Sequence, residues 1–171
     1  MSHPRNRRDF LVSTASSAAI VAIGGTLAAC GSDASPAEFN YGVASGDPLS
    51  DRVILWTHAR VKDRPDDVAL TWQVATDRPF TQIVRSGGVS ATQETSFTAK
   101  VDVTGLSPGV SYFYRFIDET GASSMIGTTR TLPAASATVV KFAVFSCALY
   151  SAGYFNAYDA AATSDAQYAI H

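Results

Sequence analysis

The sequence has 171 residues, of which 46% are hydrophobic and 11% aromatic, enough to form the core of one domain or of two small ones. Its formal net charge of −2 argues against nucleic-acid binding, which requires a basic face, so no nucleic-acid partner is expected. The only cysteines, Cys30 and Cys147, form no C-x-x-C pair, which argues against a zinc ribbon or a redox motif.

Residues 1–30 are predicted to be an export signal. Arg7 and Arg8, followed by Phe10 and Leu11, match the twin-arginine pattern, which makes the twin-arginine translocase the expected partner. A weakly apolar stretch follows, but its most apolar part, residues 18–23, is far shorter than the ~20 residues that span a bilayer. The alternative is that the two arginines are only the charged start of an ordinary signal.

Cys30 follows Leu-Ala-Ala at the end of this stretch and resembles the cysteine of a bacterial lipobox. That resemblance implies acylation of the Cys30 sulfur and a periplasmic or extracellular protein anchored to the membrane by lipid. An incidental cysteine at this position is the alternative, and a disulfide to Cys147 is formally possible. Residues 31–38 are small and polar, which predicts a linker.

Residues 39–133 are predicted to form an immunoglobulin-like or fibronectin III-like β-sandwich. Short runs of β-formers or alternating apolar residues, each bounded by turn residues, predict six or seven strands and no helix. The expected strands are residues 52–56, 68–75, 82–86, 96–103, 110–117 and 123–131, with turns that include the Gly87-Gly88 pair.

The stretch Gly-Leu-Ser-Pro-Gly-Val-Ser-Tyr-Phe-Tyr, residues 105–114, resembles fibronectin type III domains before their sixth strand. Tyr112 takes the place of the corner tyrosine, whose hydroxyl bonds to nearby backbone. Tyr112 and Tyr114 are therefore expected to be core and corner residues.

The pattern changes after residue 133. Residues 139–145 are a nearly continuous apolar run, which predicts a strand buried on both faces of an α/β sheet. A helix is expected over residues 153–162, from apolar residues at three- and four-residue spacing, and a second strand over residues 167–170. Such a short segment cannot close a core by itself, so we expect residues 139–171 to be the truncated start of a larger domain.

Two stretches resemble the PhoD-like alkaline phosphatase/phosphodiesterase family. Residues 39–57 read Phe-Asn-Tyr-Gly-Val-Ala-Ser-Gly-Asp-Pro-Leu-Ser-Asp-Arg-Val-Ile-Leu-Trp-Thr and resemble the opening of that family's N-terminal domain. Residues 142–147, Phe-Ala-Val-Phe-Ser-Cys, and 153–158, Gly-Tyr-Phe-Asn-Ala-Tyr, resemble the start of its α/β metallophosphoesterase domain. The resemblance covers nearly all of the chain after residue 38.

The resemblance implies a phosphate-ester hydrolase in which the cysteine matching Cys147 ligates an active-site iron, with calcium ions nearby. A thiolate after a strand suits that role, because open α/β sheets place their sites at the carboxyl ends of strands. The family continues beyond the position of His171 with a Gly-Asp-Tyr segment that supplies a bridging aspartate. Without further ligands, we expect no catalytic residue in this chain and no activity of the chain alone. A plain buried cysteine is the alternative for Cys147.

Other polar residues are expected to be structural. Asp47 and Asp51 flank a Pro-Leu-Ser turn, which favours capping. His58 has no apparent partner histidine, and residues 42–46 lack the Lys-Ser/Thr ending of a phosphate loop. By the family pattern, His171 is not a metal ligand.

Two functions of different classes remain. In the first, the chain is the N-terminal part of an exported, monomeric, metal-dependent alkaline phosphatase or phosphodiesterase that hydrolyses phosphate esters. In the second, it is a lipid-anchored β-sandwich that binds or adheres without catalysis, since this fold hosts many functions.

Overall fold

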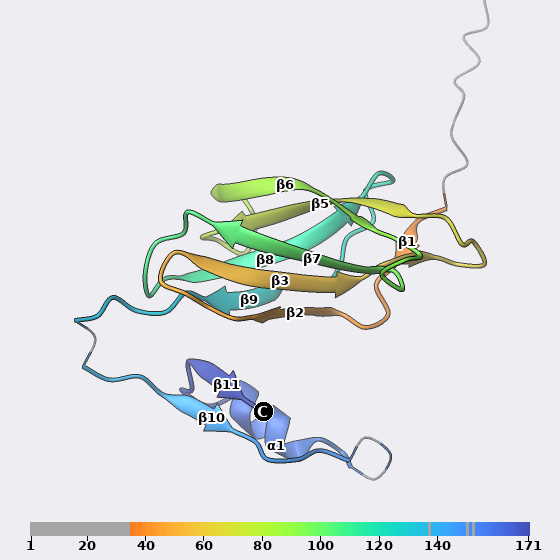
Figure 1. The fold of residues 1–171 in the computed structure, drawn as a ribbon. Coiled ribbons are helices and arrows are strands. Elements are labelled where there is room, and N and C mark those ends of the chain that lie inside the picture. The colour runs from red at the N-terminus through yellow and green to blue at the C-terminus, as the bar shows by residue number, and fades with distance from the viewer. Residues whose placement is uncertain (1–34, 137, 150, 152) are drawn as a thin grey trace, which may run out of the picture. The chain divides into compact units, whose positions relative to one another are not determined.

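A computed structural model describes residues 35–136, 138–149, 151 and 153–171, and its described part is mainly β (Figure 1). It consists of a two-sheet domain, residues 35–133, and a smaller β10–α1–β11 unit, residues 142–170. The predicted export signal, with Arg7, Arg8 and Cys30, lies outside the described residues. Among the described residues, no helix has both the length and the apolar character needed to cross a membrane.

The first sheet has the order β2-β3-β7, with both pairs antiparallel. Its strands are β2 (Val43–Gly46), β3 (Arg52–His58) and β7 (Thr98–Thr104). Strand β3 alternates strictly, since Val53, Leu55 and Thr57 are buried and their neighbours are not. The period of two is what a sheet requires when one face packs on a core.

The second sheet has the order β6-β5-β8-β9, again antiparallel throughout. Its strands are β5 (Val68–Ala75), β6 (Ile83–Ala91), β8 (Ser111–Asp118) and β9 (Gly127–Arg130). The bounds of β5 are those that the sequence predicts. The expectation that Tyr114 is a core residue is confirmed, and Leu70, Val74 and Phe116 lie in the core with it.

The core lies between the two sheets, which overlie each other in Figure 1. It combines Val53, Leu55 and Val103 from the first sheet with Val74 and Phe116 from the second, each at most 1% exposed. Burying side chains of this size stabilises a fold by about 1.5–3 kcal/mol each. The two-sheet domain therefore has a closed core of its own.

The expected corner tyrosine is confirmed. Tyr112 is 3% exposed, and its hydroxyl accepts a hydrogen bond of 2.9 Å from the backbone N–H of Ser107. This bond ties the loop before β8 to the strand itself, because donor and acceptor are five residues apart.

Two details of the predicted strands are wrong. Gly87 and Gly88 do not form a turn but lie inside β6, opposite Trp72 and Thr71. Glycine is needed at position 87 because a Cβ there would approach Trp72 Cζ2 to 2.8 Å. The strand predicted over residues 96–103 begins too early, since Phe97 has a φ of 58° and precedes β7.

The predicted linker over residues 31–38 ends too late. Ala37–Glu38 form a short strand, β1, paired with β4 (Arg60–Val61). Ala37 is 7% exposed, and its N–H donates to the Asp118 carboxylate at 2.7 Å. Its side chain therefore joins the core of the two-sheet domain.

The β10–α1–β11 unit has the predicted order of strand, helix and parallel strand. It consists of β10 (Phe142–Val144), α1 (Asn156–Ala162) and β11 (Tyr168–Ile170). The predicted helix begins too early, because Phe155 has a left-handed φ of 54° and caps α1. The expected burial of the first strand is also wrong, since Phe142 is 51% and Val144 72% exposed. Within the described residues, no second layer buries these side chains, so their apolar character alone does not bury them.

Candidate functional site

The carboxyl edge of the β10–β11 pair is the candidate site. Cys147 follows β10 after two residues, and His171 directly follows β11, so both leave the sheet at the same edge. The Phe145 N–H donates to the Ile170 carbonyl at 2.8 Å, which holds the two chains together beyond the strands. Open α/β sheets place ligands at this edge. The structure thus gives Cys147 the position in the sheet that the sequence predicts.

An aromatic cluster lies beside this edge and attaches the helix to it. The Phe145 ring centroid lies 4.7 Å from that of Tyr158 on α1 and 6.2 Å from that of His171. Tyr158 and His171 stack with 6.0 Å between centroids. His171 therefore packs against the aromatic side chains of this cluster.

Cys147 is a free cysteine and is exposed in the described part of the chain. No group of three or more His, Cys, Asp or Glu side chains among the described residues is placed to hold a metal. Stable sites need three or four donors in position, and one thiolate is not enough. The described residues therefore do not by themselves fit an iron or calcium centre.

The faces around this edge are apolar and open in the described part of the chain. Ile170 is 51% exposed and Leu149 65% exposed, and no residue of α1 is buried. Exposed apolar faces of this kind mark contact surfaces. The carboxyl edge is thus the beginning of a site rather than an enclosed one.

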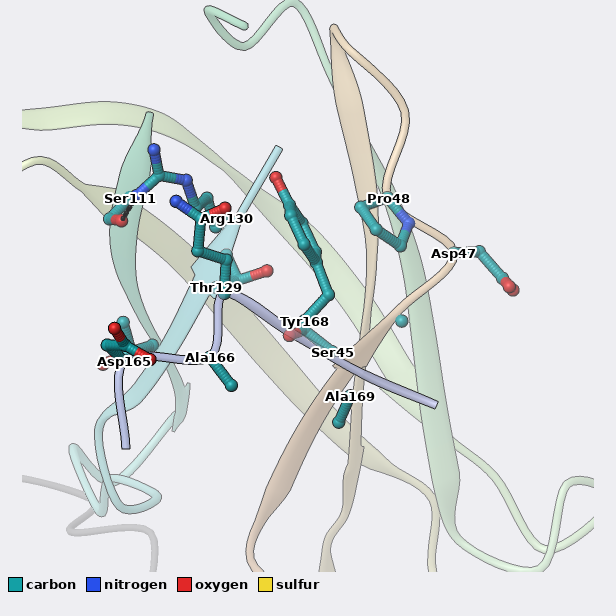
Figure 2. Close-up of a pocket in the computed structure, with 13 residues that line it drawn as sticks. Ser45, Asp47, Pro48, Ser111, Thr129, Arg130, Asp165, Ala166, Tyr168 and Ala169 are labelled. Atoms are coloured by element: carbon teal, nitrogen blue, oxygen red, sulfur yellow. Dashed lines mark hydrogen bonds between the residues drawn. The ribbon is translucent and has the colours of Figure 1, made fainter. Parts of the chain in front are cut away.

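A pocket of ≈ 580 Å³ lies between the two-sheet domain and residues 165–169 (Figure 2). Its walls come from residues 45–48 at the end of β2, from β9 and from the start of β11. Tyr168 reaches across and donates its hydroxyl to the Thr131 carbonyl at 2.7 Å. Cavities of this size can hold small molecules.

The charges of this pocket are partly neutralised. Asp165 forms an ion pair with Lys141, whose hydrogen bond and charge hold the pKa of that carboxyl below its usual value. Arg130 makes one long contact of 3.5 Å to the Ser111 hydroxyl. The pocket offers hydrogen bonds and a guanidinium, but no described metal cluster.

The remaining polar candidates lie in turns, in an exposed ion pair or against an aromatic ring. Asp47 adopts a left-handed φ of 46° in the turn after β2, and Asp51 lies 3.5 Å from Arg52 Nε. The His58 ring makes an edge contact with Tyr41, with 4.8 Å between centroids. Residues 43–46, which the sequence excludes as a phosphate loop, are strand β2.

Sequence reasoning missed Thr131 and Tyr168. Thr131 is the last residue of a polar, β-prone run, and Tyr168 is one aromatic residue in a short strand. Neither local pattern reveals a partner 37 residues away, so no sequence signal could have found the pair.

Comparison with known proteins shows the family to which the two-sheet domain is similar. The family model described as "PhoD-like phosphatase, N-terminal domain" matches residues 25–133. Alkaline phosphatase D of Bacillus subtilis (strain 168) is 43% identical over 131 residues, which are 70% of this chain and 22% of that protein.

A solved structure titled "Structure of PhoD" superposes with a TM-score of 0.73 at 37% identity. The match covers 81% of this chain and 28% of that one. The chain therefore spans less than a third of the length of either relative.

Proposed function

The chain belongs to the PhoD-like phosphatase family, and we propose from this membership that it contributes the N-terminal domain and the first strands of the catalytic domain to a phosphoric ester hydrolase. The observation that carries the proposal is the family match over residues 25–133, followed directly by a parallel β-α-β unit with a cysteine at its carboxyl edge. Phosphate esters are the substrate class.

We propose that the two-sheet domain is an immunoglobulin/fibronectin III-like sandwich. Its first sheet consists of β2, β3 and β7, and its second sheet consists of β5, β6, β8 and β9. The corner tyrosine, Tyr112, supports the same assignment. The alternative function, a lipid-anchored module that binds or adheres without catalysis, would share this fold, so the fold does not decide between the two functions.

Cys147 is, in this proposal, one ligand of an iron centre with calcium nearby, whose other ligands come from outside the described residues. Its place after β10 supports that role, because open α/β sheets place their sites at the carboxyl ends of strands. A metal at such a site would lower the pKa of a bound water and neutralise phosphate charge.

The proposal includes export by the twin-arginine translocase through Arg7 and Arg8, and a lipid anchor on Cys30. The protein would then act as a monomer in the periplasm or outside the cell, tethered to a membrane. The sequence pattern of residues 1–30 supports this part, and mass measurement of Cys30 in protein from membranes would test it.

A chimaera tests the enzymatic proposal most directly. Residues 35–171 replace the corresponding segment of Bacillus subtilis alkaline phosphatase D, and hydrolysis of p-nitrophenyl phosphate and of bis(p-nitrophenyl) phosphate is measured. We expect turnover of at least one substrate. Cys147→Ser should lower kcat more than about 100-fold, because loss of even an outer partner of a metal ligand costs 10–100-fold.

The matched control is Ser151→Ala, an exposed side chain in the same loop. It should leave kcat unchanged. An active chimaera that tolerates Cys147→Ser would remove Cys147 from the site. A well-folded but inactive chimaera would favour the lipid-anchored binding module, as would a coding sequence that does not continue with Gly-Asp-Tyr after His171.

A further inference from the structure

Tyr168 is the first residue of β11, and it is also a point of contact with the two-sheet domain. It pairs with Phe142 of β10, and the two rings lie 5.7 Å apart. Its hydroxyl donates to the Thr131 carbonyl at 2.7 Å. One side chain therefore joins the parallel strand pair to the end of β9.

Thr131 is fully buried, and hydrogen bonds hold its side chain as well as its carbonyl. The Thr131 hydroxyl donates to the Ser107 carbonyl at 2.6 Å and accepts from the Val110 N–H at 3.2 Å. A buried hydroxyl with both roles filled has no rotational freedom left, because every alternative rotamer strands a polar group.

Ser107 belongs to the loop of the corner tyrosine. Its N–H donates to the Tyr112 hydroxyl at 2.9 Å. The chain next to Thr131 is also fixed, since the Leu132 carbonyl accepts from Gly109 at 2.9 Å and the Leu132 N–H donates to Leu49 at 3.0 Å. A continuous set of hydrogen bonds thus runs from Tyr112 through Ser107 and Thr131 to Tyr168.

We propose that this set, the corner relay (Tyr112, Ser107, Thr131 and Tyr168), fixes β11 relative to the two-sheet domain and so positions the carboxyl edge that carries Cys147. Tyr168 is a positioning residue in this account. The effect on catalysis rests on the proposed function, whereas the effect on β11 does not.

The surroundings of Tyr168 make this bond matter. The ≈ 580 Å³ pocket adjoins the start of β11, so close packing does not replace the hydrogen bond on that side. The ion pair of Lys141 and Asp165 is exposed and joins β11 only to the start of β10. Loss of the Tyr168 hydroxyl should therefore raise the local opening of β11 roughly two- to tenfold, the range for one net hydrogen bond.

Amide hydrogen exchange of the full chain, read by mass spectrometry, tests the relay. Tyr168→Phe should speed exchange in peptides containing β11 and β10, and leave peptides of β5 unchanged. The control is Tyr154→Phe, which deletes the same atom from a residue that is 94% exposed. Equal rates in Tyr168→Phe and the unsubstituted chain would overturn the proposal, as would β11 exchanging like unstructured peptide in both.

Thr131 gives a second, independent pair of variants. Thr131→Val keeps the side-chain shape and removes the hydroxyl, so exchange in β11 should rise as it does in Tyr168→Phe. Thr131→Ser keeps the hydroxyl and should restore slow exchange. If valine and serine have the same effect on β11, the hydroxyl is not part of the connection and the relay fails.

The same substitutions in the chimaera separate the two proposals. Tyr168→Phe should lower kcat for p-nitrophenyl phosphate roughly two- to tenfold with little change in KM, because it displaces the edge and touches no substrate. If exchange responds but the unsubstituted chimaera is inactive, the proposed function fails and the relay stands. If the unsubstituted chimaera is active but exchange in β11 does not respond to Tyr168→Phe, the relay fails and the proposed function stands.

Discussion

The two-sheet domain and the β10–α1–β11 unit contain similar apolar residues but bury them to different extents. Phe116 on β8 is fully buried, whereas Phe142 on β10 is 51% exposed. The two sheets supply a facing layer for each other, and the described part of the β10–α1–β11 unit has no such layer. Burial is thus set by what a strand faces rather than by its own composition.

This contrast also separates the closed core from the candidate site. The corner tyrosine and the closed core belong to the two-sheet domain, while Cys147 and the carboxyl edge belong to the open unit. Active sites are often built on the less stable parts of a fold. The difference can be measured one side chain at a time.

The largest effect is expected from Phe116→Ala. It should lower the free energy of unfolding by about 3–5 kcal/mol, because it leaves a cavity in a closed core. Phe142→Ala, the matched change on β10, should cost less than about 1 kcal/mol, since that ring is already half in water. Urea unfolding followed by tryptophan fluorescence measures both, and equal costs would contradict the contrast.

Gly87→Ala should come next, with a loss of about 1–3 kcal/mol from overpacking against Trp72. A Cβ at Gly87 would lie 2.8 Å from Trp72 Cζ2, whereas one at Gly88 would lie no closer than 4.0 Å to Leu70 O. Gly88→Ala is therefore the control and should be neutral or slightly stabilising. Thermal unfolding of the two variants tests whether the tolerance of β6 differs between adjacent residues.

Tyr112→Phe should lower the free energy of unfolding by about 1 kcal/mol, because the Ser107 N–H loses its acceptor. Tyr41→Phe deletes the same atom where the side chain is 73% exposed, and should change little. Denaturant midpoints would show the difference. A Tyr112→Phe protein as stable as Tyr41→Phe would mean that the corner bond contributes nothing.

The smallest effect concerns pH. Partial burial acts to raise the pKa of Asp118, but hydrogen bonds from Ala37, Thr120 and Ala122 outweigh it and hold the pKa below its usual value. The folded state therefore binds fewer protons than the unfolded one, whose pKa is about 3.9. The stabilisation is present above that pH and is lost as pH falls through the folded pKa.

Asp118→Asn should flatten this acid limb of the stability curve, by less than about 1 kcal/mol because the carboxylate is largely solvated. Unfolding midpoints between pH 5 and pH 2 provide the measurement. Asp66→Asn, at an exposed position, is the control and should keep the limb. An unchanged limb in Asp118→Asn would mean that other carboxylates cause it.

The sequence predicts most of the two-sheet domain because alternation over five or more residues specifies both a strand and its inner face. Strand β5 and the inner face of β8 follow this rule. The turn predicted at Gly87 and Gly88 is wrong because Gly87 leaves room for Trp72 on the neighbouring strand. No local sequence pattern indicates such a contact between strands. The predicted start of the strand that contains Phe97 is wrong because the left-handed φ of Phe97 is set by the loop before β7.

The candidate site was predictable only in part. The place of Cys147 after a strand follows from local sequence, as does the parallel partner strand. Its exposure does not follow, because that depends on which layers face β10. The Tyr168 bond to Thr131 joins two positions whose neighbours in sequence carry no trace of each other.

The hydrogen bond from the Tyr168 hydroxyl to the Thr131 carbonyl, called the clasp from here on, also links two distant points of the chain. It joins residues 37 positions apart and so closes the intervening chain into a loop. Closing that loop costs conformational entropy, which is lost when the bond forms. This cost grows only slowly with the length of the loop. When the clasp opens, the tether keeps the hydroxyl at a high effective concentration near its acceptor, so reclosure is fast compared with capture from solution. Insertions between β9 and β10 should therefore be tolerated far better than any change at the clasp.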